Sequence, residues 1–366
     1  MELMQASRQW AKRPPEERFT NLTEMLEASR AFRNKSLSRR VANRDIRVAP
    51  VKDDPAGLAV TLNGMPSTPN NWAFGQLCSL VGAPAGYLKR LPTPMIADCL
   101  NYGFQIDRKI EEIGTLTVNE ADGMSTMVAA TGPDYGRIWN DSVLEKIIDR
   151  FGDGQTGKFT VPGEFGKAVT VDKDNTTLYR SDRDMFLFLA DEKNRIEIAS
   201  RRDNKPGGLA RGFFLWNSEV GASSIGVSTF LFDYTCSNRI VWGAEQFAEI
   251  KIRHTVGAPH RWMEEIAPAL EIYAEGSTHS IVEAITAARG KRIGDGDAVT
   301  AFLTKRFNSA NTAKAIQLAH IAEESRPIET LWDATTGITA YAKGIQYQDR
   351  RIEVEREGGK VMALAM

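Results

Sequence analysis

Residues 211–243 read RGFFLWNSEVGASSIGVSTFLFDYTCSNRIVWG, and this stretch decides the fold prediction. Aromatic, β-branched and small residues dominate it, and such a composition favours strands over helices. Two polar groups interrupt it, at residues 217–219 and at residues 236–239. The stretch therefore predicts two or three adjacent strands joined by tight turns.

Both polar groups need hydrogen-bond partners, so each is either a structural corner or part of a site. For Asn217, Ser218 and Glu219 we favour a turn closed by bonds from side chains to the backbone, with a metal or phosphate site as the alternative. Cys236 with His254 or His260 is the enzymatic alternative, a thiol–imidazole pair. The surrounding residues YTCSN match no recognised protease signature, so a buried strand cysteine is the favoured interpretation.

The 366 residues, 42% hydrophobic and 25% charged, indicate a globular chain of one large or two ordinary domains. A formal net charge of −1 excludes a wholly basic, histone-like protein but leaves room for a local basic groove. The three cysteines and four histidines lack metal-ligand spacing, and there is no phosphate loop or dinucleotide fingerprint, so we expect no metal and no cofactor. Without an apolar leader or membrane span, we expect a cytoplasmic protein with no membrane partner.

The order of the predicted elements is α+β, with a largely antiparallel sheet decorated by helices. We divide the chain into a basic helical arm (1–45), an α+β core (46–261) and a helical C-terminal region (262–366) that packs on the core. Within the core, residues 112–131 and residues 184–199 each read as a hairpin. In the C-terminal region, Asp297 is the expected N-cap of a helix.

Positive charge is segregated along the chain. Residues 29–47 contain seven basic residues and one acid, and residues 195–211 form a second basic stretch. Basic side chains beside aromatic strands suit a phosphate backbone and its bases, although a solvated helix face would look the same. The residues that we predict to bind nucleic acid are Arg39, Arg40, Arg44, Arg201, Arg202, Lys205 and Arg211, with Trp216 as the stacking residue.

Several stretches together resemble a family of uncharacterised phage- and plasmid-encoded proteins, known mainly as a domain of unknown function. They are RPPEERFTNLTEML (13–26), WAFGQLCSLVGAPAGYLKRLP (72–92), NSEVGASSIGV (217–227), YTCSNRIVWGA (234–244) and TLWDATTGITAYAKGIQYQDRRIEVER (330–356). Relatives more often read C-T-N-G where this chain has Cys236-Ser237-Asn238-Arg239, which puts a tight turn there in doubt. The resemblance implies a cytoplasmic protein of a mobile element and assigns no catalytic residue.

Mobile elements of this kind often encode single-strand annealing or recombination proteins that assemble as rings or filaments. Our leading hypothesis is therefore a protein that binds single-stranded DNA in replication or recombination, works as a homo-oligomer and does not hydrolyse nucleotides. This rests on context and analogy of fold. The alternatives are a protein-interaction module acting on a host or phage partner through the C-terminal helices, and an enzyme built on Asn217, Glu219, Cys236 and His254.

Overall fold

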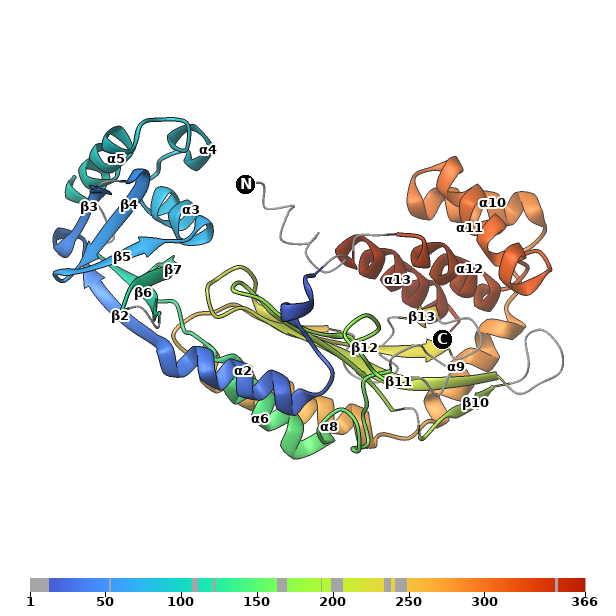
Figure 1. Cartoon of the computed structure of the whole chain (residues 1–366). Coiled ribbons are helices and arrows are strands. Elements are labelled where there is room, and N and C mark those ends of the chain that lie inside the picture. Colours follow the sequence, from blue (N-terminus) through green and yellow to red (C-terminus); the bar gives the residue numbers. More distant parts are fainter. Residues whose placement is uncertain are drawn as a thin grey trace.

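The chain folds as an α+β protein with two β-sheets and a helical C-terminal third, as the sequence predicts (Figure 1). In Figure 1, sheet A spans the middle of the molecule, sheet B with its helices lies at one end, and the C-terminal helices lie at the other. The computed structural model describes residues 13–52, 54–106, 111–120, 123–162, 170–191, 193–198, 207–233, 238–240, 249–345 and 348–365.

Sheet A is built around the stretch that decides the fold prediction. Its strands follow the order β1-β8-β9-β11-β12-β13, with β10 added to β11 and β14 added to β12, and every described pairing is antiparallel. The strands are β1 (Arg18–Phe19), β8 (Leu178–Arg180), β9 (Met185–Ala190), β10 (Ile196–Ile198), β11 (Gly207–Asn217), β12 (Ile225–Asp233), β13 (Asn238–Ile240) and β14 (Glu249–Ile252). The prediction of adjacent strands after residue 211 is confirmed.

The predicted hairpin at residues 184–199 is wrong. Among the described pairings, β9 and β10 do not bond to each other, because both line up along β11. Asp191 marks the break between them: its side chain accepts hydrogen bonds from Asn194, while its backbone N–H donates to the carbonyl of Arg211. The turn residues after Asp191 could be recognised in the sequence. The pairing of both strands with the longer strand β11 could not.

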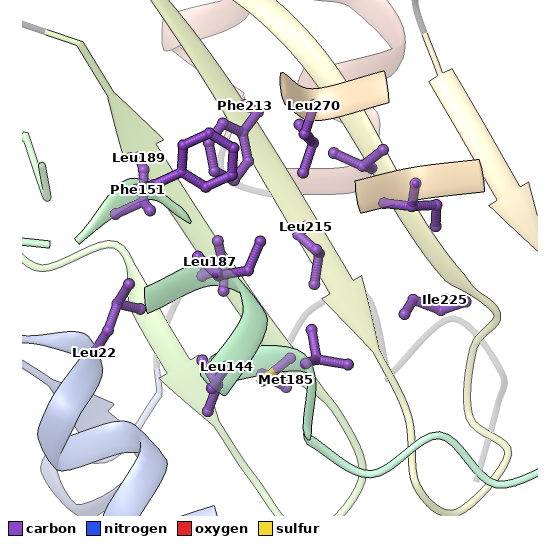
Figure 2. Close-up of a cluster of buried hydrophobic side chains, with 14 of the residues drawn as sticks. Leu22, Leu144, Phe151, Met185, Leu187, Leu189, Phe213, Leu215, Ile225 and Leu270 are labelled. Atoms are coloured by element: carbon purple, nitrogen blue, oxygen red, sulfur yellow. The ribbon is translucent and has the colours of Figure 1, made fainter. Parts of the chain in front are cut away.

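Three helices cover one face of sheet A: α2 (Leu22–Lys35), α6 (Asn140–Phe151) and α8 (Ala267–Glu275). Alternate residues of the central strands point to them, and Figure 2 shows Leu187 and Leu189 of β9 beside Phe213 and Leu215 of β11. All four side chains are buried. Each such residue stabilises the fold by about 1.5–3 kcal/mol through burial.

The opposite face of sheet A carries aromatic rings. They are Tyr179, Phe186, Phe188, Phe214, Trp216 and Phe230. The rings of Phe188 and Phe230 stack with centroids 4.4 Å apart. The Phe230 ring covers Gly212, where an added Cβ would lie 2.1 Å from Cζ of that ring. Glycine is therefore required at residue 212, because a side chain there would displace the ring.

Sheet B and its helices form the N-terminal lobe. The strands are β2 (Ser36–Ala42), β3 (Ile46–Val51), β4 (Asp54–Leu62), β5 (Met65–Pro69), β6 (Glu112–Asn119) and β7 (Ser125–Thr131), and the helices are α3 (Asn71–Leu80), α4 (Ala85–Leu88) and α5 (Thr93–Gln105). Their order is β2-β6-β7-β5-β4-β3, antiparallel except for β5 with β7. The predicted hairpin at residues 112–131 is confirmed as β6 and β7.

The basic N-terminal arm is helical over α2 and then changes to strand β2, which follows it directly (Figure 1). Residues 36–42 pair along their whole length with β6, more than seventy residues later in the chain. The sequence near residue 40 contains no signal for this strand, because the partner that stabilises it is remote. The strand places consecutive arginines on opposite faces of sheet B.

The C-terminal third is helical, as predicted. Its elements are α7 (Ala258–Arg261), the π-helical turn η3 (Trp262–Ile266), α8, α9 (His279–Gly290), α10 (Gly296–Phe307), α11 (Ala310–Glu324), α12 (Leu331–Lys343) and α13 (Gln348–Ala363), with 3₁₀ turns η1 (Pro15–Glu17) and η2 (Asn43–Asp45) near the other end of the chain. The N-cap of α10 is Asp295, which accepts from the N–H of Ala298, and not Asp297 as we predicted. The helix therefore begins at Gly296, two residues earlier than predicted.

Candidate nucleic-acid interface

The structure divides the first group of predicted residues between two faces. Arg39, Arg40 and Arg44 are all exposed. Arg39 shares its face of β2 with the buried Val41, and its Nη1 lies 3.7 Å from Sδ of Met65. Arg40 points to the other face, where its Nη1 lies 3.5 Å from a carboxylate oxygen of Glu112. The two neighbouring arginines therefore cannot contact one ligand from the same side.

The second predicted basic group gives little to compare. Arg201, Arg202 and Lys205 lie outside the described residues, as does Cys236. Arg211 is buried in β11, and its guanidinium donates to the carbonyls of Tyr273, Ala274 and Gly276 at the end of α8. A cation at a helix C-terminus stabilises the helix. Arg211 therefore stabilises the end of α8, and its position offers no support for a phosphate contact.

Trp216 lies on the aromatic face of sheet A and is partly buried. Its ring covers Gly226, where an added Cβ would lie 2.2 Å from Cζ2 of the indole. The ring centroid is 5.8 Å from that of Phe214, and Nζ of Lys251 lies 5.7 Å from it. These neighbours occupy the ring, so the structure gives no independent sign of base stacking at Trp216.

The densest meeting of positive charge and aromatic rings lies elsewhere, where α2 reaches sheet B. Here four guanidinium groups lie over rings, at distances from carbon to ring centroid of 5.2 Å for Arg33 and Trp139, 5.3 Å for Arg137 and Tyr135, 4.6 Å for Arg180 and Phe32, and 5.5 Å for Arg183 and Trp72. We call these eight residues the arginine–aromatic cluster. Arg33 is exposed, and the other seven residues are partly buried. Cation–π pairs of this kind fix the guanidinium planes.

The corner at residues 217–219 positions this cluster. The side-chain amide of Asn217 donates to the carbonyl of Ile138 and to Oδ1 of Asn140, both at 2.8 Å. Oε1 of Glu219 accepts the backbone N–H of Asn140 at 2.9 Å. These bonds hold the segment that carries Arg137 and Trp139 against the end of β11. The structural interpretation of the corner is thus confirmed.

Ser218 extends the same corner toward Arg183. Its hydroxyl donates to the backbone carbonyl of Arg183 and accepts the N–H groups of Val220 and Ala222. The Val220 carbonyl in turn accepts from Nε1 of Trp72 at 3.0 Å. The connection between β11 and β12 therefore ties the tip of the β8–β9 hairpin to the N-terminal lobe, and the arginines of separate elements meet.

The segment that carries Arg137 is held by contacts from two remote parts of the chain, residues 254–255 and Glu219. Gly136 and His254 exchange two hydrogen bonds, and the ring of Tyr135 stacks on that of His254 with centroids 4.9 Å apart. A Cβ at Gly136 would lie 1.9 Å from the Thr255 carbonyl oxygen, so only glycine permits this approach. Arg137 itself donates to the backbone carbonyl of Glu219.

The cluster is continuous with strand β2 through one contact. Nε of Arg137 donates to Oγ of Ser38 at 3.4 Å. Ser38 and Arg40 are two residues apart in a regular strand and share a face, whereas Arg39 points away. The predicted basic stretch at 29–47 therefore meets a second basic group, Arg137, Arg180 and Arg183, which the sequence analysis did not select.

Charge compensation within the cluster is uneven. Arg33 donates to both carboxylate oxygens of Asp141, at 3.0 and 2.9 Å. The carboxylate that acts most strongly on Arg180 is Glu219, with 4.0 Å between Nη2 and Oε2, and Asp182, Asp141 and Glu17 add weaker attraction. Burial raises the pKa of the Glu219 carboxyl and lowers the pKa of the Arg180 guanidinium, and each charge partly offsets the shift of the other. Arginine stays protonated nonetheless, so the cluster holds positive charge that is incompletely neutralised.

The enzymatic alternative gains no support from the described residues. The side chains of Asn217 and Glu219 bond within the corner, and Nδ1 of His254 donates to the Gly136 carbonyl. In the part of the chain that the structure describes, no group of three or more His, Cys, Asp or Glu side chains is arranged to hold a metal ion.

Comparisons with protein-family models, curated proteins and solved structures found no match to this chain. None of the described helices is long and apolar enough to cross a membrane. The function must therefore be argued from the arrangement of the side chains alone.

Proposed function

We propose that this protein binds single-stranded nucleic acid through the arginine–aromatic cluster and the adjoining face of β2. The observation that carries the proposal is that four arginines from separate parts of the chain each lie over an aromatic ring at one place on the molecule. In the phage and plasmid context that the sequence resembles, such binding would serve replication or recombination.

The chemistry of the cluster matches the two parts of a nucleotide. Guanidinium groups bind phosphate oxygens, and guanidinium and aromatic planes both stack with bases. The fixed planes of Arg137 and Arg180 lose little side-chain entropy on binding, because each already lies over an aromatic ring and Arg137 also donates to the Glu219 carbonyl. Preorganised planes of this kind favour a ligand that offers both a flat ring and an anion.

A single strand suits the cluster better than a duplex. In a duplex the base faces are stacked on each other, so protein side chains reach only base edges and phosphates. In a single strand the base faces are free to stack on side chains. The guanidinium–ring pairs offer planes and not a helix for the major groove, so we expect a preference for the unpaired strand.

Fluorescence anisotropy with a labelled single-stranded oligonucleotide tests this function, using a duplex of equal length beside it. We expect single-strand binding that weakens steeply with salt, and weaker duplex binding. Arg40→Ala should weaken binding evenly across sequences and reduce the slope of log K against log salt by about 1. Arg39→Ala is the matched control, because it removes the same charge from the opposite face.

Two results would count against the proposal. Flat anisotropy at low salt would exclude nucleic-acid binding by the purified protein. Equal losses for Arg39→Ala and Arg40→Ala would mean that the positive charge of β2 acts without regard to its face, and the cluster would lose its support.

A second candidate function is protein binding through the C-terminal helices. Leu318 and Ile321 of α11 are 57% and 45% exposed and lie three residues apart, on one side of the helix. Exposed apolar residues together on a helix are a common feature of protein interfaces. Replacing both with glutamate should leave oligonucleotide binding unchanged, which separates this surface from the cluster.

A further inference from the structure

We propose that Arg180 is the phosphate-binding residue of the arginine–aromatic cluster, and that Glu219 is its temporary counter-ion, which a bound phosphate replaces. This inference rests on the function proposed above and specifies which group recognises the backbone.

The guanidinium of Arg180 has an unused edge. Its Cζ lies 4.6 Å from the ring centroid of Phe32, and this contact fixes its orientation. Nε and Nη2 are buried and make no hydrogen bond to a described residue. These two nitrogens form the side of the group that binds two oxygens at once. Buried donors almost always have acceptors, so two adjacent unused donors indicate a partner yet to bind.

Glu219 does not fill this role. The 4.0 Å between Nη2 of Arg180 and Oε2 of Glu219 is longer than a hydrogen bond. The other carboxylate oxygen of Glu219 is committed to the N–H of Asn140, and Asp141 adds a like charge nearby. Moving Glu219 closer would strain the corner that holds the cluster. The pair is therefore an attraction at a distance and not a closed salt bridge.

Arg33 shows what a closed pair looks like in the same cluster. It donates to both oxygens of Asp141 within 3.0 Å, so an incoming anion would have to displace a well-bonded carboxylate. An anion at Arg180 would displace only a distant one. The Arg180 side chain is 12% exposed, so a ligand at the surface can reach the side chain, and its approach to the buried Nε and Nη2 requires a local shift. A phosphodiester supplies two adjacent oxygens of the required charge.

The first test measures single-strand affinity by anisotropy in four proteins at one salt concentration. Arg180→Lys keeps the charge but loses the two-donor edge, and we expect about a tenfold loss, the size of one charge-assisted hydrogen bond. Glu219→Gln keeps the acceptor for Asn140 and removes the competing charge, so affinity should rise several-fold. Arg30→Gln is the control, because Arg30 lies outside the cluster and is already paired with Glu145, and we expect a change below about twofold. Wild-type affinity in Arg180→Lys, or no gain in Glu219→Gln, would overturn the inference.

The second test uses inorganic phosphate and does not depend on nucleic-acid binding. The melting temperature is followed as phosphate replaces chloride at constant ionic strength. The inference predicts a phosphate-dependent rise that is smaller in Arg180→Lys and larger in Glu219→Gln than in the wild type. If the protein binds no oligonucleotide but shows this pattern, the proposed function fails and the phosphate site stands. Equal rises in all variants would overturn the site.

Discussion

Strand β11 has a buried arginine near two of its positions, and the surroundings of the two differ. In the middle of the strand, Arg211 donates to three carbonyls where α8 terminates. Beyond its C-terminal end, Arg180 faces Glu219 of the polar corner across 4.0 Å, and two of its nitrogens make no hydrogen bond to a described residue. Both side chains are largely buried, yet one is nearly satisfied and the other is not.

This difference separates structural from functional positive charge. A buried charge that donates most of its hydrogen bonds to the protein stabilises its surroundings and has little to offer a ligand. A buried charge that is poorly compensated costs stability, and the cost can be recovered when an anion binds. By this criterion Arg211 belongs to the fold and Arg180 belongs to the site, although the sequence analysis selected Arg211.

The largest expected effect comes from Arg211, whose guanidinium donates to three backbone carbonyls. Arg211→Ala leaves the carbonyls of Tyr273, Ala274 and Gly276 without their donor and removes the cation at the end of α8, so it should lower the free energy of unfolding by about 3 kcal/mol. Arg180→Ala should cost clearly less, because it breaks no hydrogen bond to a described residue. Urea denaturation of both variants measures the difference. Equal losses of unfolding free energy would remove the distinction between Arg211 and Arg180.

The sequence could predict the sheet but not the cluster. Residues 211–243 predicted adjacent strands because β-branched and aromatic residues mark them locally. Arg137 is isolated in the sequence, and Arg180 and Arg183 alternate with Asp182 and Asp184, so no run of positive charge marks these three arginines. They meet only because the corner at 217–219 binds two distant segments, and such long-range hydrogen bonds leave no local pattern.

One part of the site was within reach of sequence reasoning. The corner was recognised as polar residues between strands, and its partners in the fold are the backbone groups that bring the arginines together. Arg39 and Arg40 show the limit: charge counting treats neighbouring residues alike, whereas a strand places them on opposite faces. That distinction required the pairing of β2 with β6.

A smaller effect should appear in the pH dependence of stability that Glu219, the carboxylate facing Arg180, gives the protein. Burial raises the pKa of Glu219 in the folded protein above its usual value of 4.5. The folded state then holds a proton that the unfolded chain releases, so stability from this group is present below pH 4.5 and is lost as pH rises through the folded pKa. Relative to Glu219→Gln, the wild type should therefore become less stable as pH rises above 4.5. If the difference in unfolding free energy between the wild type and Glu219→Gln stayed constant with pH, burial would not destabilise the charged form of Glu219.

The smallest expected effect concerns His254, which supports the Arg137 segment. Burial lowers the pKa of its imidazole below the usual 6.5, and the nearby Arg137 charge lowers it slightly further. Stability from the neutral ring is therefore present above pH 6.5 and is lost as pH falls through the folded pKa. An NMR titration of the His254 ring should give a pKa below 6.5 that rises a little in Arg137→Gln.

Arg33→Gln serves as the control for that titration, because the Arg33 charge is already paired with both oxygens of Asp141. We expect no change in the His254 titration in this variant. If Arg137→Gln also left the pKa of the His254 imidazole unchanged, the Arg137 charge would be screened from Tyr135 and His254. The uncompensated positive charge of the cluster would then be confined to Arg180. If the pKa rose as much in Arg33→Gln, the paired and unpaired arginines would not differ electrostatically, and the contrast on which the phosphate site rests would fail.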